Sequence, residues 1–214
     1  MAKLDPATAT RPPAAVAPQP KKVAQILPAA ADLFLEHGFD VVTMDMVAAR
    51  SGVSKATLYV YFKSKEELFS AIVEDEARRL IDGVSAEIDD LGEIDVVLRK
   101  MAKKFLVLLT DDRTVALYRA VVGSVPRFPD VGRIVHEAGP LRMTATIAAF
   151  LATANDDGRL HVSDPTLAAR QFLSLARCDF DVEALLSRPR HSDVELDQAV
   201  EAAVEVFLAA YGRA

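Results

Sequence analysis

The sequence predicts an all-α fold in which an N-terminal three-helix helix-turn-helix domain precedes a larger helical domain. After residue 21, apolar residues recur at spacings of three and four along almost the whole chain, as they do on the buried face of an α-helix. No convincing alternation of apolar and polar residues predicts a strand. Residues that cap helices are also dense. Thr43, Ser54 and Ser64 lie within about twenty residues, which is typical of short helices packed at angles.

The composition limits the class of protein. Of the 214 residues, 51% are hydrophobic and 26% are charged, and the formal net charge is −6, which suits a globular chain with a sizeable core. The longest apolar runs, such as residues 105–109, are far shorter than the roughly 18 residues that span a membrane. The N-terminus lacks the apolar segment of a secretory signal. A single cysteine, Cys178, excludes an internal disulfide and a thiolate zinc cluster. We therefore expect a cytoplasmic protein with no membrane partner.

The N-terminal segment divides into a tail and a first helix. Residues 1–21 are expected to form a disordered tail, because five of the eleven prolines lie among the first twenty residues and little of this segment could be buried. The first helix carries apolar residues from Val23 to Leu35 and ends at His37 and Gly38, where glycine suits a left-handed conformation. Pro28 lacks a backbone donor, so it should either kink this helix or confine its regular part to the residues after it.

Capping residues predict where several of the next helices begin. A glutamate three residues after Ser64 and after Ser192 gives each of these two sites a capping-box pattern. The capped helices are residues 44–50 after Thr43, residues 55–61 after Ser54, residues 65 to about 81 after Ser64, and a last helix within residues 192–211. The other helices are expected at residues 93–110, 112–122, 129–138, 141–155 and 164–186.

Residues 43–62 have the layout of a helix-turn-helix, in which the second helix enters the major groove of DNA. Val47, Ala48, Val53 and Leu58 are spaced to bury against the first helix. Gly52 supplies the positive φ that the tight turn requires. The segment 55–65 contains three lysines and no acidic residue, which suits a surface that meets phosphates.

The outward side chains of this motif predict the contacts with DNA. Lys55 can donate to guanine, Thr57 can bond a base or a phosphate, and Val60 can contact a thymine methyl group. Phe62 is the expected buried anchor, and the tyrosine hydroxyls are expected to reach phosphates, although core positions for the tyrosines remain an alternative. The helix lacks Arg, Asn and Gln, so DNA shape should contribute to recognition. The predicted DNA-binding residues are Thr43, Ser54, Lys55, Ala56, Thr57, Tyr59, Val60, Tyr61, Lys63 and Lys65.

A frame of about fifty residues surrounds this motif. It consists of Ile26-Leu27, Ala29-Ala30, Leu33-Phe34, Gly38-Phe39, Thr43, Ser51-Gly52-Val53-Ser54-Lys55, Thr57-Leu58-Tyr59, Tyr61-Phe62 and Ser64-Lys65-Glu66-Glu67-Leu68. Through this frame, residues 23–72 resemble the DNA-binding domain of the TetR/AcrR family of transcriptional regulators, and Pro28 departs from the usual family pattern of the first helix. The resemblance implies that residues 22–68 form the DNA-binding domain and that residues 55–61 form its recognition helix.

The remainder of the chain carries a looser set of motifs. These are Tyr118-Arg119-Ala120-Val121-Val122, Arg127-Phe128-Pro129, Gly139-Pro140, Gly158-Arg159-Leu160, Asp164-Pro165 and Ala168-Ala169-Arg170-Gln171-Phe172. They resemble the C-terminal domain of the AefR-like branch of the same family. The resemblance implies that residues 69–214 bind an effector and dimerise through the last two long helices. Those helices carry more apolar residues than one core needs, and a symmetric dimer would match a near-palindromic operator.

An effector pocket is harder to predict. Eight side chains on central helices could line an apolar cavity, and plain core packing explains each of them equally well. Arg119 and Arg142 could bind a polar group of a ligand or lie in surface ion pairs. The candidate ligand-binding residues are Phe105, Leu109, Tyr118, Phe128, Met143, Ile147, Phe150 and Phe172.

We therefore expect a homodimeric, sequence-specific DNA-binding regulator, a repressor that a small, largely apolar effector releases from its operator. No cofactor, metal or enzymatic activity is expected. His136-Glu137 lacks the second histidine of a zinc protease because Pro140 stands there, and nucleotide-binding glycine motifs are missing. Cys178 is expected to be a small buried hydrophobic residue rather than a redox sensor. An architectural DNA-binding protein without an effector remains an alternative, and the cationic residues of the tail could add a contact with DNA.

Overall fold

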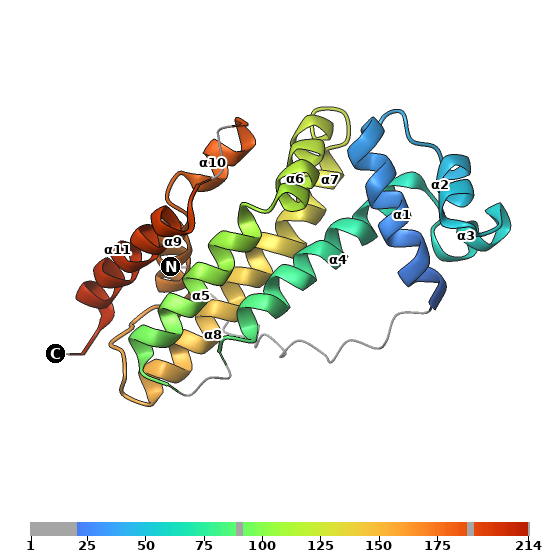
Figure 1. The fold of residues 1–214 in the computed structure, drawn as a ribbon. Coiled ribbons are helices and arrows are strands. Elements are labelled where there is room, and N and C mark those ends of the chain that lie inside the picture. Colours follow the sequence, from blue (N-terminus) through green and yellow to red (C-terminus); the bar gives the residue numbers. More distant parts are fainter. Residues whose placement is uncertain (1–20, 89–91, 188–190, 214) are drawn as a thin grey trace, which may run out of the picture.

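The computed structural model describes residues 21–88, 92–187 and 191–213. Within these ranges it contains helices and one isolated β-bridge, between Leu160 and Gly212, and no strand. Figure 1 shows an elongated molecule with α1, α2 and α3 at one end. The helices are α1 (Lys21–His37), α2 (Met44–Ser51), α3 (Lys55–Tyr61), α4 (Lys65–Ser85), α5 (Ile94–Leu109), α6 (Asp112–Ser124), α7 (Pro129–His136), the π-helix η1 (Glu137–Leu141), α8 (Arg142–Asp156), α9 (Pro165–Arg177), α10 (Phe180–Leu185) and α11 (Asp193–Tyr211).

The all-α prediction is confirmed, and the predicted caps form. The side chains of Thr43, Ser54 and Ser64 each accept a hydrogen bond from a backbone N–H in the first turn of α2, α3 and α4. The capping box of Ser192 and Glu195 is complete at the start of α11. The box expected at Ser64 does not close, because the Glu67 carboxylate accepts from the backbone N–H of Lys63 and not from that of Ser64. Residues 1–20 of the predicted tail lie outside the described residues, whereas Lys21 is already the first residue of α1.

Proline affects two helices differently. Helix α1 begins seven residues before Pro28 and continues past it, so of the two alternatives the structure excludes the one in which the regular part starts after the proline. In the second case, residues 129–156 form a continuous helical run, and Pro140 lies in the wider π turn that joins α7 to α8. Proline cannot donate the usual backbone bond and crowds the preceding turn, which favours such a local change of helix.

The single helix expected at residues 164–186 was also wrong. It is broken at Cys178, whose φ of 48° is left-handed, and α10 begins only at Phe180. Arg119 of α6 stabilises the end of α10 by donating to the backbone oxygens of Ala184 and Leu185, at 2.5 and 3.0 Å. Cys178 is exposed on the chain, so the expectation that it is buried was wrong.

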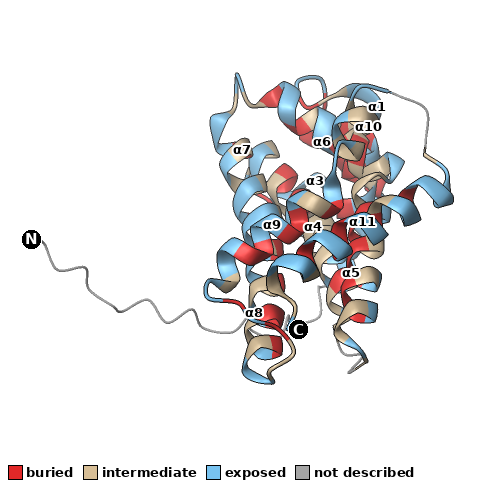
Figure 2. Ribbon diagram, turned by 90° about the vertical axis from the view of Figure 1, so that its left-hand side faces the viewer, coloured by how far each residue is buried: buried red, intermediate tan, exposed pale blue. Residues whose placement is uncertain are grey.

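Two hydrophobic cores organise the fold. The first lies among α1–α4 and also includes Leu117 and Val121 of α6 and Val131 of α7. The head is the part of the molecule formed by α1–α3 and the start of α4. The second lies among α4, α5, α8, α9 and α11, which form the body. Buried residues follow the facing sides of these helices in Figure 2. The predicted domain boundary after residue 68 falls within α4, which contributes to both cores.

Candidate nucleic-acid interface

The turn between α2 and α3 is fixed from several directions. Gly52 adopts a φ of 66°, as predicted, and its N–H completes the end of α2. The buried Ser51 hydroxyl donates to the Val47 carbonyl oxygen at 2.6 Å, and the Gln25 side chain of α1 donates to the Ser51 carbonyl oxygen at 2.6 Å. This clamp by Gln25 was not predicted. Together these bonds hold α3 at a defined angle to α1 and α2.

Helix α3 turns one face into the head and one face outward. Leu58 and the following Phe62 are buried, at 0% and 6% exposure. The opposite face exposes Lys55, Ala56, Tyr59 and Val60, and Thr57 is half-buried. The Ser54 and Thr57 hydroxyls lie 2.8 Å apart at the start of the helix. An exposed valine beside an exposed tyrosine adds nothing to the head's core, so this face is available to a partner.

Lys55 has an acidic partner on the other helix of the motif. Its Nζ lies 2.7 Å from Oδ1 of Asp45, in the first turn of α2. The hydrogen bond from Lys55 to Asp45, together with the attraction of the two charges, raises the pKa of Lys55 above its ordinary value. Both side chains are mostly exposed, so this ion pair contributes little to folding. The lysine ammonium is thus charged, and it lies beside Asp45 at an exposed position of the motif.

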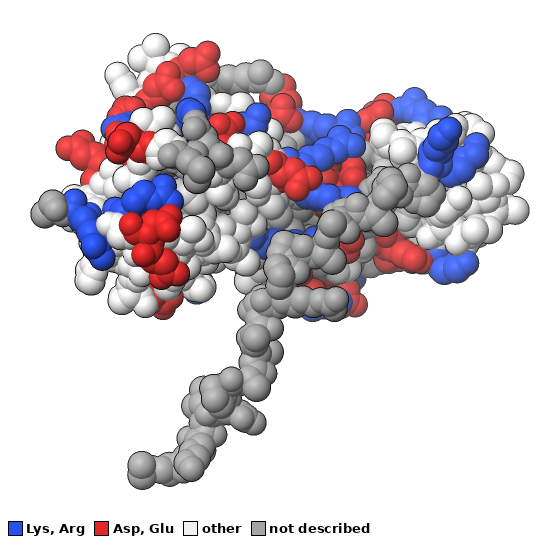
Figure 3. All heavy atoms as spheres, turned by 90° about the horizontal axis from the view of Figure 1, so that it is seen from below, with Lys and Arg blue, Asp and Glu red and all other residues white. Residues whose placement is uncertain are grey.

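Two lysines that were predicted to contact DNA phosphates bind backbone oxygens within the head. Lys63 Nζ donates to the carbonyl oxygen of Tyr59 at 2.9 Å and thereby caps the end of α3. Lys65 Nζ donates to the carbonyl oxygen of Phe39 at 2.7 Å and lies 4.5 Å from the centre of its ring. Tyr61 is half-buried against the head's core. Figure 3 shows basic side chains near the outer end of the head, together with acidic ones and an uncharged tip.

An aromatic cluster joins the head to the segment that links α6 and α7. Phe39 packs edge-on against Phe69 of α4 and against Phe128, which precedes α7, with ring centres 5.0 and 4.8 Å apart. Phe34 of α1 packs against the same Phe69 at 5.1 Å. Phe128, a predicted pocket residue, therefore contributes to the head's core.

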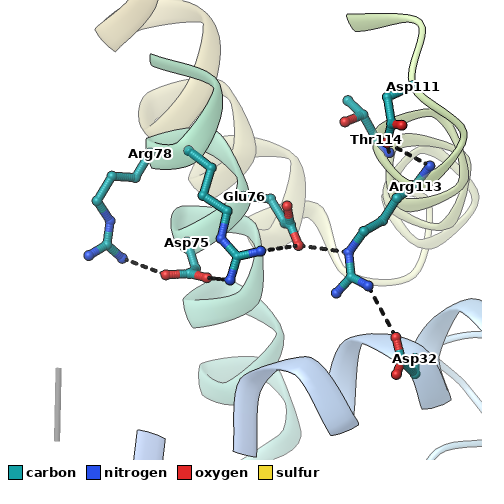
Figure 4. A network of polar contacts seen from close by, with 8 residues as sticks. Asp32, Asp75, Glu76, Arg78, Asp111, Arg113 and Thr114 are labelled. Atoms are coloured by element: carbon teal, nitrogen blue, oxygen red, sulfur yellow. Dashed lines mark hydrogen bonds and ion pairs between the residues drawn. The ribbon is translucent and has the colours of Figure 1, made fainter. Parts of the chain in front are cut away.

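A polar network joins α6 to α4 and to α1 of the head (Figure 4). Arg113 of α6 donates to Glu76 of α4 at 2.9 Å and to Asp32 of α1 at 3.2 Å. Arg79 pairs with Asp75 at 2.9 Å and extends the network along α4. One guanidinium thus connects three helices, and a movement of α6 relative to α4 has to break or stretch these bonds.

The other predicted pocket residues lie in two places. Tyr118 is 45% exposed on α6 and lines no core. The remaining six pack in or against the core of the body: Phe105, Leu109, Met143, Ile147, Phe150 and Phe172.

A hollow of about 470 Å³ lies elsewhere, between α5, α6, α10 and the start of α11. Its lining includes Val107, Val115, Arg119 and Leu196 and none of the eight predicted pocket residues. The structure therefore does not bring those eight residues together around one cavity that it describes.

The described residues also bear on other classes of site. They contain no group of three or more His, Cys, Asp or Glu side chains placed to hold a metal ion. None of the described helices is long and apolar enough to cross a bilayer.

Comparison with known proteins agrees with this geometry. Residues 26–72 match the bacterial regulatory proteins of the tetR family, and residues 96–213 match the C-terminal domain of AefR-like transcriptional repressors. An uncharacterised HTH-type transcriptional regulator of Bacillus subtilis, YfiR, is 33% identical over 64% of this chain and 77% of its own length.

Solved structures agree as well. The flavonoid-responsive regulator FrrA is 34% identical, with a TM-score of 0.76 over 91% of this chain and 99% of that chain. A TetR-family regulator of Mesorhizobium loti is 29% identical, with a TM-score of 0.84 over 90% of this chain and 98% of that chain.

Proposed function

Because the chain belongs to the TetR family of DNA-binding transcriptional regulators, we propose that it is a repressor that a small, largely apolar effector releases from its operator. The observation that carries this proposal is the exposed face of α3, which is held rigidly by Gln25 and Gly52 and presents Lys55 and Val60 outward. A cytoplasmic location follows from a DNA partner. Similarity to AefR-like repressors supports repression rather than activation.

The proposed DNA contacts are divided between bases and phosphates. Lys55, Thr57 and Val60 read base edges, with Ser54 and Ala56 close to the groove at the start of α3. Thr43, Tyr59, Tyr61, Lys63 and Lys65 meet the backbone and fix the register of the head without reading sequence. Because Lys63 and Lys65 already bind carbonyl oxygens with part of their donor capacity, DNA would take up their remaining N–H groups.

We further propose a homodimer formed through α9 and α11. Leu167 of α9 and Val206 of α11 are 48% and 55% exposed on the single chain, on helices whose other faces fill the body's core. Burying such side chains against a second copy is favourable, and a two-fold dimer presents two α3 helices to a near-palindromic operator.

The effector is proposed to bind the C-terminal domain, residues 69–214, and to act on the DNA-binding domain, residues 22–68. The name of FrrA, which is flavonoid-responsive, supports an effector that is small and largely apolar. Such an effector must bind one spacing of the two heads better than the other, with a coupling of about 1–3 kcal/mol. Helix α4 is the proposed lever, because it contributes to both cores and carries Glu76 of the interhelical network.

One selection experiment tests the proposal. The purified protein is mixed with random duplex DNA, and the retained fragments are sequenced with and without cell extract from the source cells. We expect a near-palindromic sequence that is enriched without extract and lost when the extract supplies the effector. Retention of the same sequence under every condition would favour the architectural alternative, and the absence of any enriched sequence would overturn the proposed operator.

A further inference from the structure

Asp45 stands out because its carboxylate lies on the surface that the head presents to DNA. A carboxylate neutralises no phosphate, so an acidic side chain on this surface needs another explanation. The pair with Lys55 is 66% and 60% exposed, so folding gains little from it. The structure of the motif is secured by other groups, namely the caps of Thr43 and Ser54 and the buried Leu58.

The pair bridges the two helices of the motif across the turn. Lys55 is the first residue of α3, and Asp45 is the second residue of α2. Lys55 is also the only Lys or Arg in residues 51–62, so no other cation of the recognition helix can take its place. An ammonium group has three N–H donors. With one donor held by Asp45 at 2.7 Å, the other two keep a preferred direction.

The consequence differs between operator and random DNA. On random DNA, an unpaired lysine would neutralise a phosphate and release a counterion, which favours binding to every sequence. A lysine that is already neutralised by Asp45 gains little from a phosphate. At an operator, a guanine offers two acceptors in the groove, and a directed ammonium can bind them while the carboxylate remains beside it.

We propose that Asp45 is a specificity-determining residue that acts by positioning Lys55: it withholds the Lys55 charge from phosphates and directs the ammonium toward a base edge. This inference rests on the proposed role of α3 as the recognition helix. It assigns to an acidic residue of α2 the suppression of binding to random DNA.

The test compares Asp45→Asn with the unaltered protein on two probes: the fragment recovered in the selection above and a random duplex of equal length. We expect Asp45→Asn to bind the random duplex about eightfold more tightly at 0.1 M salt for each head that engages it, with a salt slope steeper by about 0.9 per head. Affinity for the selected fragment should change by less than about threefold, so the preference for it falls. Thermal unfolding should be unchanged, because the pair is exposed.

Two controls separate positioning from bulk charge. Glu66→Gln removes one negative charge at another exposed position of the head, in the first turn of α4, and should change neither affinity by more than about twofold. In a Lys55→Ala background, Asp45→Asn should lose its effect, because the partner is gone.

Each remaining outcome overturns the inference. An Asp45→Asn effect that persists without Lys55 would show that the carboxylate acts by general repulsion. Unchanged binding of random DNA by Asp45→Asn would show that Lys55 is not withheld from phosphates. If the unaltered protein prefers no fragment over random DNA, the proposed function itself fails, and this result is distinct from a retained preference that Asp45→Asn leaves intact.

Discussion

The Arg113 guanidinium of α6 donates to Glu76 of α4 at 2.9 Å while it also reaches Asp32 of α1. This contact joins α6 to α4, the helix that contributes to the cores of both the head and the body. Its side chains are 38% and 20% exposed, so solvent weakens the pair without cancelling it. In the proposed mechanism, a shift of α6 relative to α4 acts directly on this contact.

We predict a coupling energy of about 1 kcal/mol between Arg113 and Glu76. Urea unfolding of Arg113→Met, Glu76→Gln, the double variant and the unaltered protein measures it. The exposed pair of Arg133 and Glu137, on the run from α7 to η1, is the control and should show no measurable coupling. Equal coupling in the two cycles would mean that the network of Figure 4 is an ordinary surface feature.

Lys55→Ala should weaken binding to the selected operator about 5- to 150-fold and relax the preference at one base pair, because a base contact is lost. Binding to random DNA should change far less, since Asp45 neutralises this lysine in the free protein. Fluorescence anisotropy with both duplexes measures the two affinities. An equal loss of affinity for both duplexes would show that Lys55 does not contact a base.

Lys63→Ala should weaken every duplex alike and lower the salt slope by about 0.9 per head, because one phosphate contact disappears. The variant also loses the cap on the Tyr59 carbonyl oxygen, so circular dichroism must first show an intact fold. Lys104→Ala on α5 of the body serves as the control and should leave the slope unaltered. A constant slope for Lys63→Ala would exclude a phosphate contact at this position.

Gly52→Ala should destabilise the head by about 1–2 kcal/mol, because an alanine is strained at a φ of 66°. Crowding contributes little, since a Cβ at Gly52 would meet only Gln25, at 3.7 Å. Gly123 offers a matched control within helix α6, where an added Cβ meets nothing within 4 Å. Gly123→Ala should stabilise the protein by about 0.5–1 kcal/mol. Urea denaturation that shifts both variants in the same direction would contradict this account of the turn.

The features that sequence could predict are local ones. Thr43, Ser54 and Ser192 cap helices because each side chain accepts from the N–H three residues later, so the pattern is visible in the sequence itself. The same holds for Gly52, whose neighbours demand a tight turn.

Features that depend on distant packing were not predictable. For Phe128 the sequence left pocket lining and core packing open, and the structure packs it on Phe39, 89 residues earlier in the chain, because only the folded molecule brings the start of α7 to the head. Likewise Lys65 meets the Phe39 carbonyl oxygen across 26 positions. The break in the helix at Cys178 could not be predicted, because no glycine or proline lies next to it in the sequence. Apolar periodicity predicts that Phe150 and Phe172 are buried, but it cannot distinguish a core from a pocket.

The capping box of α11 predicts a pH dependence of stability. Ser192 donates its backbone N–H and its hydroxyl to the Glu195 carboxylate, both at 2.8 Å, and these bonds lower the pKa of Glu195 below its ordinary value. A carboxyl group with a lowered folded-state pKa stabilises the fold fully above its unfolded-state pKa, and this contribution is lost as the pH falls through the folded-state value.

Glu195→Gln should therefore be less stable than the unaltered protein at pH 7, with a difference that stays constant down to about pH 5 and shrinks below the ordinary glutamate pKa of about 4.3. Thermal unfolding of both proteins between pH 7 and pH 3 measures the difference. Glu205→Gln, at an exposed position of the same helix, is the control and should show no such convergence. A difference between the proteins that persists unchanged at pH 3 would mean that Glu195 stabilises α11 through its shape and not through its charge, since the protonated acid and the amide carry none.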